Sequence, residues 1–373
     1  MISRAIENRI KDKLLKGKAV ILLGARQTGK TTLLKKIVQD KSDVLWLNAD
    51  ETDTMALFEN TSSSRLRAIF SGKSIVVIDE AQRISDIGLK LKLITDEIPD
   101  IQLIATGSSA FELANQVNEP LTGRKWEYNL FPLSFSEMVK HHGLLEESRM
   151  LPHRLVYGYY PEVVSHPGNE KEILKQLSDS YLYKDILMWE RIKKPEKLIR
   201  LLQALALQVG SEVSYNNLAS FLGMDNQTVE KYIQLLEKTF IIFRLPAFSR
   251  NYRKELKRGR KIYFYDNGIR NALLASFNLP ELRTDIGALW ENFIISDRIK
   301  RLHNDGIWAN SFFWRTQDQQ EIDYIEERDG TLYAYEIKWN IKKSPSLSKS
   351  FVNAYPEHEY KVINPGNYEQ FLL

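Results

Sequence analysis

The residues whose types and spacing point most directly to chemistry follow a short apolar run at positions 20–23. They are Gly24, Ala25, Arg26, Gln27, Thr28, Gly29, Lys30, Thr31 and Thr32. Residues 24–31 fit the pattern GxxxxGK[ST], which forms a phosphate-binding loop when a buried strand precedes it and a helix follows it. Lys30 would neutralise the β and γ phosphates of ATP, and the hydroxyl of Thr31 would bind Mg²⁺. The sequence therefore predicts a site for ATP and Mg²⁺ over residues 24–32.

A pair of acids, Asp79 and Glu80, ends a second apolar run in the stretch SIVVIDEAQ. Four consecutive aliphatic residues predict a strand buried on both faces, as in a parallel sheet. At the end of this strand Asp79 would hold the Mg²⁺ shell, and Glu80 would orient or deprotonate the attacking water. The alternative is an acidic pair that caps a helix. The phosphate loop upstream favours the catalytic interpretation.

A third apolar run, IQLIATGSSA, ends in hydroxyl residues. Thr106, Ser108 or Ser109 would contact the γ phosphate or the attacking water, and we assign this role to Ser108. The alternative is a tight turn rich in glycine and serine. With the further run DVLWLNAD, these strands alternate with helical segments, which predicts an α/β fold with a doubly wound parallel sheet.

A second group of acids lies near the other end of the sequence. The strand-like stretches QEIDYIEE and TLYAYEIKW flank Asp329-Gly330, a pair typical of a β-hairpin turn. Glu336 and Lys338 lie two residues apart and would share a strand face, which Asp323 of the paired strand can reach. Carboxylates this close repel one another unless a cation lies between them, and Mg²⁺ readily accepts their oxygens. The alternative is a plain ion pair between Glu336 and Lys338.

A helix expected over residues 285–302 adds a further carboxylate to this group. Glu291 lies close in the sequence to Ala288 and Ile295, whose helical spacing marks an apolar face. A half-buried acid needs a partner, such as a lysine, a helix terminus or a metal ion. Glu291 is therefore a candidate companion of Asp323 and Glu336.

Between these two regions the sequence predicts a helical lid or linker and then a winged helix-turn-helix. A short helix at 215–221, a turn containing Gly223 and a second helix from Asp225 or Asn226 precede the strand-like run FIIFRLPAF. The next stretch, SRNYRKELKRGRKIYFYD, carries cations that would contact DNA phosphates: Arg250, Arg253, Lys254, Lys257, Arg258, Arg260 and Lys261. The alternatives are a solvated hairpin and a module that docks proteins.

Composition sets outer bounds on these interpretations. The chain has 373 residues, which predicts two or three domains, and no apolar run approaches the roughly 20 residues of a membrane span. It has no cysteine, which excludes disulfides and thiolate metal sites, and we expect a cytoplasmic protein. A net charge of +4 permits a nucleic-acid partner without requiring one.

Several of these segments resemble a known family. GARQTGKTTLL, SIVVIDEAQ, IATGSSAFEL, LTGRKWEYNLFPLSFSEM and YGYYPEVV are similar to AAA+ ATPases and, more narrowly, to a prokaryotic AAA+ family of largely unassigned function. The similarity covers nearly the whole chain. In AAA+ proteins an arginine of a neighbouring subunit often completes the site, which points here to Arg124 and to a homo-oligomer. The alternative for Arg124 is a salt bridge that steadies the last strand.

The C-terminal acids have a resemblance of their own. Glu291, Asp323, Glu336 and Lys338 resemble the PD-(D/E)XK nuclease set, which implies that Asp323 and Glu336 bind metal, Glu291 is an outer ligand and Lys338 is the catalytic lysine. We thus expect an ATPase core at 1–140, a helical lid at 141–208, a winged helix at 209–258 and a restriction-endonuclease-like domain at 259–373.

The expected function is a Mg²⁺-dependent ATPase that couples its nucleotide state to DNA binding. One alternative is a nucleotide-dependent switch that docks other proteins and carries an inert nuclease-like domain. The other is an active, ATP-regulated DNA endonuclease.

Overall fold

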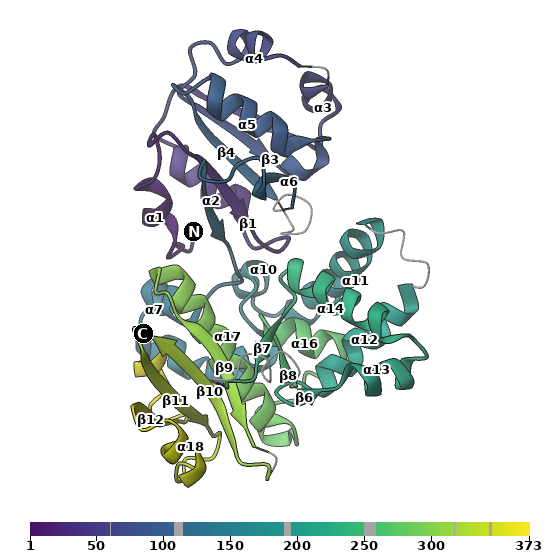
Figure 1. The fold of residues 1–373 in the computed structure, drawn as a ribbon, viewed down its shortest axis with the longest axis vertical. Coiled ribbons are helices and arrows are strands. Elements are labelled where there is room, and N and C mark those ends of the chain that lie inside the picture. Colours follow the sequence, from purple (N-terminus) through teal and green to yellow (C-terminus); the bar gives the residue numbers. More distant parts are fainter. Residues whose placement is uncertain (60, 108–114, 190–194, 250–258, 317, 343–344) are drawn as a thin grey trace. The chain divides into compact units, whose positions relative to one another are not determined.

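The chain forms two compact units in a computed structural model (Figure 1). The structure describes residues 1–373 except 60, 108–114, 190–194, 250–258, 317 and 343–344, and gives only the backbone of residues 115–116 and 180–189. The first unit comprises residues 1–132 with 238–240, and the second comprises residues 133–237 with 241–373. Among the described residues no helix is long and apolar enough to cross a membrane.

The first unit is built on a five-stranded parallel sheet in the order β2-β3-β4-β1-β5. Its strands are β1 Ala19–Leu23, β2 Val44–Asn48, β3 Ile75–Asp79, β4 Gln102–Gly107 and β5 Lys125–Asn129. Strands β1, β3 and β4 are buried throughout, because helices cover both faces of the sheet. The α/β fold with a parallel central sheet is thus confirmed.

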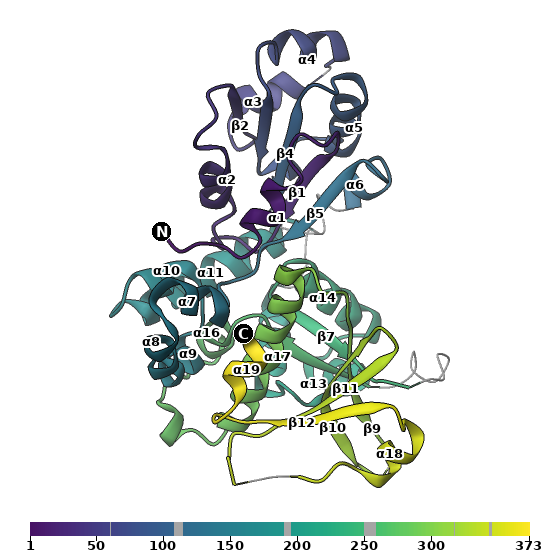
Figure 2. The ribbon, with the colours of Figure 1, turned by 90° about the vertical axis from the view of Figure 1, so that its left-hand side faces the viewer.

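Helices lie on both sides of this sheet. They are α1 Glu7–Lys11, α2 Lys30–Val38, α3 Thr52–Phe58, α4 Ser63–Ile69, α5 Ile87–Glu97, α6 Asn115–Asn118 and the 3₁₀ turn η1 Ala81–Arg83. Residues of α1 and α2 pack against alternate residues of β1 and β3 in one apolar core. Figure 2 shows α5 on the opposite side of the strands from α2. The carboxyl ends of the strands therefore form one open edge of the sheet.

The second unit begins with helices and a small antiparallel sheet. The helices are α7 Phe135–His142, α8 Leu144–Arg149, α9 Leu151–Tyr157, α10 Pro161–Ser165, α11 Glu170–Trp189, α12 Pro195–Leu207, α13 Tyr215–Leu222, α14 Asn226–Lys238 (its last residue belongs to the first unit), α16 Asn267–Leu273 and the 3₁₀ turn η3 Pro280–Leu282. The sheet has the order β6-β8-β7, with β6 Glu212–Val213, β7 Ile242–Pro246 and β8 Arg260–Phe264.

The C-terminal part contains a four-stranded mixed sheet in the order β12-β11-β10-β9. Its elements are α17 Ile286–Asp305, β9 Asn310–Arg315, β10 Glu321–Arg328, β11 Thr331–Ile337, α18 Lys349–Ala354, β12 His358–Ile363 and α19 Tyr368–Leu372. Asp329 and Gly330 both have positive φ, as the expected hairpin turn between β10 and β11 requires. Helix α18 packs on one face through Phe351. Contacts from α17 and α19 cover the other face.

Four expected domains are therefore grouped into two units. The expected start of the nuclease-like domain at residue 259 falls inside the three-stranded sheet, because β8 pairs with both β6 and β7. The expected end of the ATPase core at residue 140 also differs from the structure, in which the second unit begins at Leu133.

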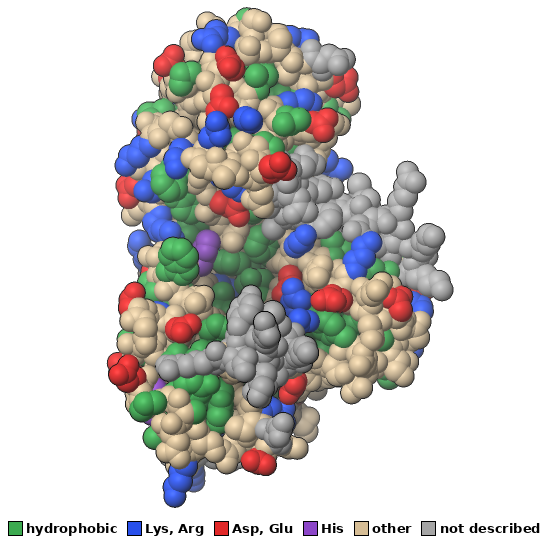
Figure 3. Space-filling model, viewed as in Figure 1, with side chains coloured by type: hydrophobic (Ala, Val, Ile, Leu, Met, Phe, Trp, Pro, Cys, Tyr) green, Lys and Arg blue, Asp and Glu red, His purple; other side chains and the backbone are tan. Residues whose placement is uncertain are grey.

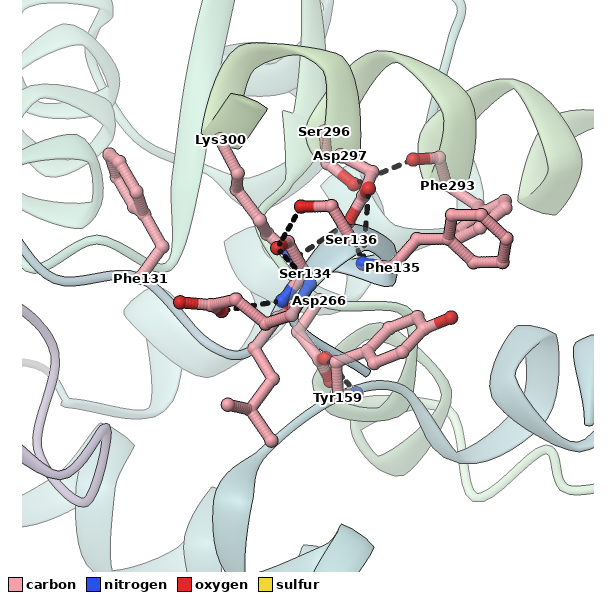
Figure 4. Close-up of polar contacts among 12 residues, drawn as sticks. Phe131, Ser134, Phe135, Ser136, Tyr159, Asp266, Phe293, Ser296, Asp297 and Lys300 are labelled. Carbon is pink, nitrogen blue, oxygen red and sulfur yellow. Dashed lines mark hydrogen bonds and ion pairs between the residues drawn. The ribbon is translucent and has the colours of Figure 1, made fainter. Parts of the chain in front are cut away.

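A buried ion pair anchors the start of the second unit to α17 (Figure 4). The carboxylate oxygens of Asp297 accept hydrogen bonds from the backbone N–H of Phe135 at 3.1 and 3.2 Å. Lys300 Nζ donates to the carbonyl of Leu133 at 3.2 Å and lies 3.9 Å from Asp297. Both charged side chains are at most 2% exposed. Leu133 and Phe135 are thus held through backbone atoms, so these contacts do not depend on the side chains at the two positions.

Candidate functional site

The phosphate-loop segment forms a tight turn between β1 and α2. Gln27 and Gly29 have positive φ, and Gly29 is the residue from which α2 starts. A Cβ atom at Gly24 would lie 2.2 Å from the carbonyl oxygen of Leu130, so only glycine fits there. The ammonium group of Lys30 donates to the carbonyls of Gly24 and Ala25, at 2.9 Å each. The loop therefore places a buried lysine and a helix N-terminus at the open edge of the sheet.

A chain of hydrogen bonds joins this loop to the two neighbouring strands. The hydroxyl of Thr31 donates to Asp79 at 2.8 Å, and the hydroxyl of Thr106 donates to the other oxygen of Asp79 at 2.5 Å. Thr106 also accepts the backbone N–H of Glu80 at 3.0 Å. Glu80 has a positive φ of 53°, and its carboxylate accepts from Gln82 at 2.6 Å. Residues from β3, β4 and α2 thus meet around one carboxylate.

The donor set fits Mg²⁺ and a nucleotide. A threonine hydroxyl and a carboxylate in direct contact are oxygen ligands of the type that Mg²⁺ binds together with phosphate oxygens. The turn directs backbone N–H groups and the α2 N-terminus toward the same place, where phosphates are favoured. Lys30, Thr31 and Asp79 would hold the nucleotide and its metal ion, which would neutralise charge on the phosphates.

The structure also shows where the other expected residues of this unit lie. Thr106 contacts Asp79, whereas Ser108 lies outside the described residues, so its sensor role remains a prediction. Arg124 precedes β5 at the amino edge of the sheet and forms an ion pair with Asp96 at 2.5 Å. This contact is the alternative we gave for Arg124. Its role toward a neighbouring copy remains a prediction.

Sequence reasoning missed a further residue of this region. Arg4 donates to the carbonyl of Thr28 in the phosphate loop and to the carbonyl of Phe131, at 2.6 Å each. Its guanidinium therefore links the loop backbone to the segment through which the chain leaves β5. No pattern marks Arg4, because its partners are backbone atoms that depend on the fold alone.

The C-terminal acids Asp323 and Glu336 do lie together, as the hairpin predicted. Lys338 is 2.8 Å from Asp323 and 2.7 Å from Glu336. Asp323 also accepts the backbone N–H of Ile337 at 2.8 Å. Burial raises the pKa of Glu336 to about 7, with the charge of Asp323 adding to this effect and Lys338 opposing it. Burial also opposes ionisation of Asp323, but Lys338 and Lys261 outweigh it and lower the pKa of that carboxyl.

Glu291 has a partner of its own, a buried lysine from the three-stranded sheet. Lys261 Nζ lies 3.2 Å from Glu291 and also pairs with Glu321, and Tyr263 donates to Glu291 at 2.6 Å. Lys261 is only 2% exposed. Burial lowers its pKa, but the acids, Glu291 foremost, reverse this and raise it to about 12. The expectation that Lys261 contacts DNA phosphates is therefore wrong, because its ammonium group is buried and paired with Glu291 and Glu321.

These acids do not fit the expected three-ligand metal site. Within the described residues no three His, Asp or Glu side chains are grouped so that they could hold a metal ion. Lys338 lies between Asp323 and Glu336, and Glu291 contacts Lys261, so ammonium groups occupy the places where a cation would neutralise the carboxylates. The ion-pair alternative describes this arrangement of Glu336 and Lys338.

The basic stretch and Asp266 complete this region; for Asp266 the sequence IYFYDNG predicts a cap at the end of a strand. Of the seven cations, Arg250, Arg253, Lys254, Lys257 and Arg258 lie outside the described residues. Arg260 lies 5.3 Å from the ring of Tyr215 and 3.9 Å from Glu230. Asp266 caps α16 by accepting the N–H of Ile269, as a strand-end cap should.

Three family models match consecutive segments of the chain. Residues 16–139 match an AAA domain, residues 148–279 match a domain of unknown function (DUF8612), and residues 286–372 match another (DUF4143).

Similar proteins span most of the chain. An uncharacterised protein of Mycobacterium tuberculosis is 24% identical over 367 residues, which cover 96% of this chain and 79% of that protein. One of Methanocaldococcus jannaschii is 22% identical over 367 residues, covering 91% and 80% respectively. Among solved structures, a Walker-type ATPase of Pyrococcus abyssi has a TM-score of 0.50 at 16% identity and covers 74% of this chain and 96% of its own. This likeness shows the fold. The parallel sheet, the phosphate loop and the match of residues 16–139 together support an AAA-type P-loop ATPase domain in the first unit.

Proposed function

We propose that this chain is a Mg²⁺-dependent ATPase whose nucleotide state controls the binding of DNA by its second unit. The observation that carries the proposal is the contact of Thr31 and Thr106 with Asp79 beside the phosphate loop. In this proposal Lys30 binds the β and γ phosphates, and Thr31 with Asp79 holds Mg²⁺. Glu80 orients the attacking water or accepts its proton, and Thr106 fixes the backbone of Glu80.

DNA is the partner that the second unit favours. The elements follow the order α12-β6-α13-α14-β7-β8, which is the order in a winged helix, and β8 lies between β6 and β7 in the sheet. Helix α14 starts at a firm cap, in which Asp225 accepts the N–H of Thr228 at 2.8 Å. The connection from β7 to β8 has a strongly cationic sequence. On the face drawn in Figure 3, cations and acids are otherwise interspersed, so phosphate binding would rest on this local segment.

The path from the nucleotide to the second unit runs through the backbone. Arg4 ties the phosphate loop at Thr28 to Phe131, four residues before Phe135. Leu133 and Phe135 are held in turn by Lys300 and Asp297 of α17. A change in the loop on nucleotide binding would therefore pull on a segment whose other end is fixed in the second unit. Coupling between the nucleotide and the second unit requires a continuous series of contacts that can adopt two arrangements.

In this proposal the C-terminal domain has a nuclease-like fold but does not cleave DNA. The order α17-β9-β10-β11-α18-β12 resembles the nuclease fold that the sequence suggested. Its acids are neutralised by Lys338 and Lys261, so we assign them to holding the domain together. Mg²⁺-dependent nicking of DNA that disappears in Asp323→Ala would instead establish the endonuclease alternative.

The ATPase assignment is tested by Lys30→Ala. We expect ATP hydrolysis to fall at least about 100-fold, because the phosphates lose their direct cation. Lys35→Ala is the matched control, since Lys35 is an exposed lysine of the same helix. Circular dichroism should show both variants folded. Hydrolysis at the normal rate by folded Lys30→Ala would falsify the assignment.

The DNA assignment is tested by a salt titration of duplex binding, with and without ATP. We expect affinity to fall steeply with salt, because several cations would release counterions from the phosphates. We also expect ATP to change the affinity in the wild type, and to change it much less in Arg4→Ala. No measurable binding at low salt contradicts the DNA assignment and favours the protein-docking alternative.

A further inference from the structure

A cavity of about 400 Å³ lies on the face of the C-terminal sheet that α17 and α19 cover. Tyr333 and Tyr335 of β11 point into it, whereas Glu336 faces the other side, because successive strand residues alternate. The cavity is thus separate from the cluster of acids and lysines described above. The lining residues that carry charge are Arg298, Arg301, Arg328, Glu359 and Lys361.

A buried carboxylate lies beside two of the arginines in this cavity and orients one of them. Glu326 is 0% exposed and accepts two hydrogen bonds from Arg298, from Nε at 2.6 Å and from Nη2 at 3.0 Å. Arg328 Nε lies 3.2 Å from the same carboxylate. One acid therefore supports two guanidinium groups, which leaves one positive charge uncompensated at this point. The fork-like contact fixes the plane of the Arg298 guanidinium before a ligand arrives. Nε of Arg328 forms no hydrogen bond in the part of the chain that the structure describes.

Two further cations extend the positive surface toward the solvent. Arg301, one turn after Arg298 on α17, donates to the carbonyl of Phe371 at 2.9 Å, as Arg298 does through its Nη1. Lys361 of β12 is exposed and has no hydrogen-bond partner in the part of the chain that the structure describes. Glu359 is the acid among the lining residues. Four cations thus face a cavity with one lining carboxylate. Glu326 and Asp305 pair with three of them from outside the lining, so a positive surface remains that stabilises a bound anion.

Aromatic rings complete the cavity and set the shape of its ligand. The guanidinium of Arg328 lies 4.1 Å from the ring centre of Tyr333, and that of Arg298 lies 4.6 Å from the ring centre of Phe371. These contacts hold the cations against flat surfaces. A volume of about 400 Å³ exceeds what a bare inorganic anion fills and is within the range of small-molecule sites. The ligand chemistry is therefore an anion joined to a larger, partly apolar group.

We propose that this cavity binds a terminal phosphate monoester of a nucleotide, with Arg301, Arg328 and Lys361 contacting the phosphate. The bound group is either a free nucleoside monophosphate or the 5′-phosphorylated end of a nucleic-acid strand. Guanidinium groups match the paired oxygens of a phosphate, and a tyrosine ring suits the attached sugar and base. All residues that line the cavity belong to the second unit, so it is distinct from the phosphate loop of the first unit.

The test measures binding of a 3′-fluorescein hexathymidylate with and without a 5′ phosphate, by anisotropy. All proteins carry Lys30→Ala, so that the phosphate loop of the first unit contributes little. We expect the phosphorylated strand to bind at least about tenfold more tightly. Lys361→Ala and Arg301→Ala should each remove most of this difference, whereas Lys349→Ala, at an exposed lysine of the same domain, should leave it unchanged. Lys361 is exposed, so its variant should fold even if Arg301→Ala does not.

Competition with thymidine 5′-monophosphate shows whether the bound group is a free nucleotide or the 5′-phosphorylated end of a strand. Displacement of the strand by the free nucleotide supports a small-molecule site, and retention of the strand supports a strand-end site. Equal binding of the two strands, together with no effect of thymidine monophosphate on the melting temperature, overturns the proposal. So does an equal loss of binding in Lys349→Ala, since binding would then follow total charge alone.

Discussion

Lysines and carboxylates meet in both units of this molecule, but their surroundings differ. In the first unit Lys30 donates to two backbone carbonyls, and Asp79 accepts from two hydroxyl groups. In the second unit Asp323 and Glu336 share the ammonium group of Lys338, and Glu291 contacts Lys261. Because its two hydroxyl partners are neutral, the charge of Asp79 remains able to meet a metal ion. Ammonium partners have already neutralised the acids of the second unit.

In our proposal, this difference separates a phosphate and metal site from a cluster that stabilises a fold. A hydroxyl and a carboxylate in contact can both turn to a metal ion, because a hydrogen bond to a charged group contributes only about 1.5 to 3 kcal/mol, which the metal ion offsets. A buried ion pair loses much more when one partner is removed, since the other charge is left without compensation. The same residue types thus serve opposite purposes, and the nature of their partners distinguishes the two.

The largest effect should come from Asp79→Asn. We expect ATP hydrolysis to fall by about 1,000-fold, because the amide retains the hydrogen bonds with Thr31 and Thr106 poorly and cannot neutralise Mg²⁺. Steady-state phosphate release measures this effect. The matched change in the second unit, Asp323→Asn, should leave hydrolysis unchanged. A similar loss in both variants would erase the proposed distinction.

Lys261→Met should lower the free energy of unfolding by roughly 3 to 4 kcal/mol. The change leaves Glu291 and Glu321 without their shared buried cation. Urea denaturation followed by tryptophan fluorescence measures it. The double variant Lys261→Met, Glu291→Gln should recover part of the loss, since one of the unpaired charges is then gone. A metal role for these acids predicts instead that Lys261→Met gains stability when Mg²⁺ is added.

The buried pair at the start of the second unit gives a pH dependence. Burial raises the pKa of Asp297 from 3.8 to about 6, although Lys300 opposes the shift and Glu137 and Glu147 add to it. The folded state therefore binds the proton of Asp297 more tightly than the unfolded state does. The contribution of Asp297 to the free energy of unfolding is largest below pH 4 and falls as the pH rises to 6.

Asp297→Asn should remove this slope. Between pH 4 and 7 the wild type should lose about 2 to 3 kcal/mol more than the variant, as measured by urea denaturation at each pH. Phe135 keeps a side-chain acceptor in the asparagine variant, so the fold should persist. Parallel pH profiles for the two proteins would show that Asp297 is ionised across this range.

The smallest effect concerns Arg124. If it completes the site of a neighbouring copy, Arg124→Ala should slow hydrolysis about tenfold, whereas Asp96→Asn should not. As an exposed ion pair, Arg124 and Asp96 contribute less than about 1 kcal/mol to stability. Hydrolysis rates at several protein concentrations measure the first effect. Equal rates for both variants would leave Arg124 with the ion pair alone.

Much of the fold could be predicted because local patterns determine it. The aliphatic runs at β1, β3 and β4 predicted buried parallel strands, and the glycine-rich loop predicted the start of α2. Asp329-Gly330 predicted the hairpin, because few residue pairs accept positive φ at both positions. The need of Glu291 for a partner was also predictable from its place beside an apolar helix face.

The sequence did not determine which partners meet across strands. The contact of Thr106 with Asp79 requires the register of β3 and β4, in which Ile78 pairs with Ala105. Lys261 belongs to a cationic run in the sequence, and only the pairing of β8 turns it inward to Glu291. Arg4 contacts backbone carbonyls, which carry no sequence information at all.

The close approach of Leu130 to Gly24 has a consequence for comparing sequences. This glycine is required by the neighbouring backbone, whether or not a phosphate ever binds. A descendant of this chain that had lost its nucleotide would still have to keep Gly24, although it could exchange Lys30 and Thr31 freely. Gly24 is therefore evidence that the backbone of Leu130 packs against the loop, whereas Lys30 and Thr31 are evidence of phosphate and metal binding.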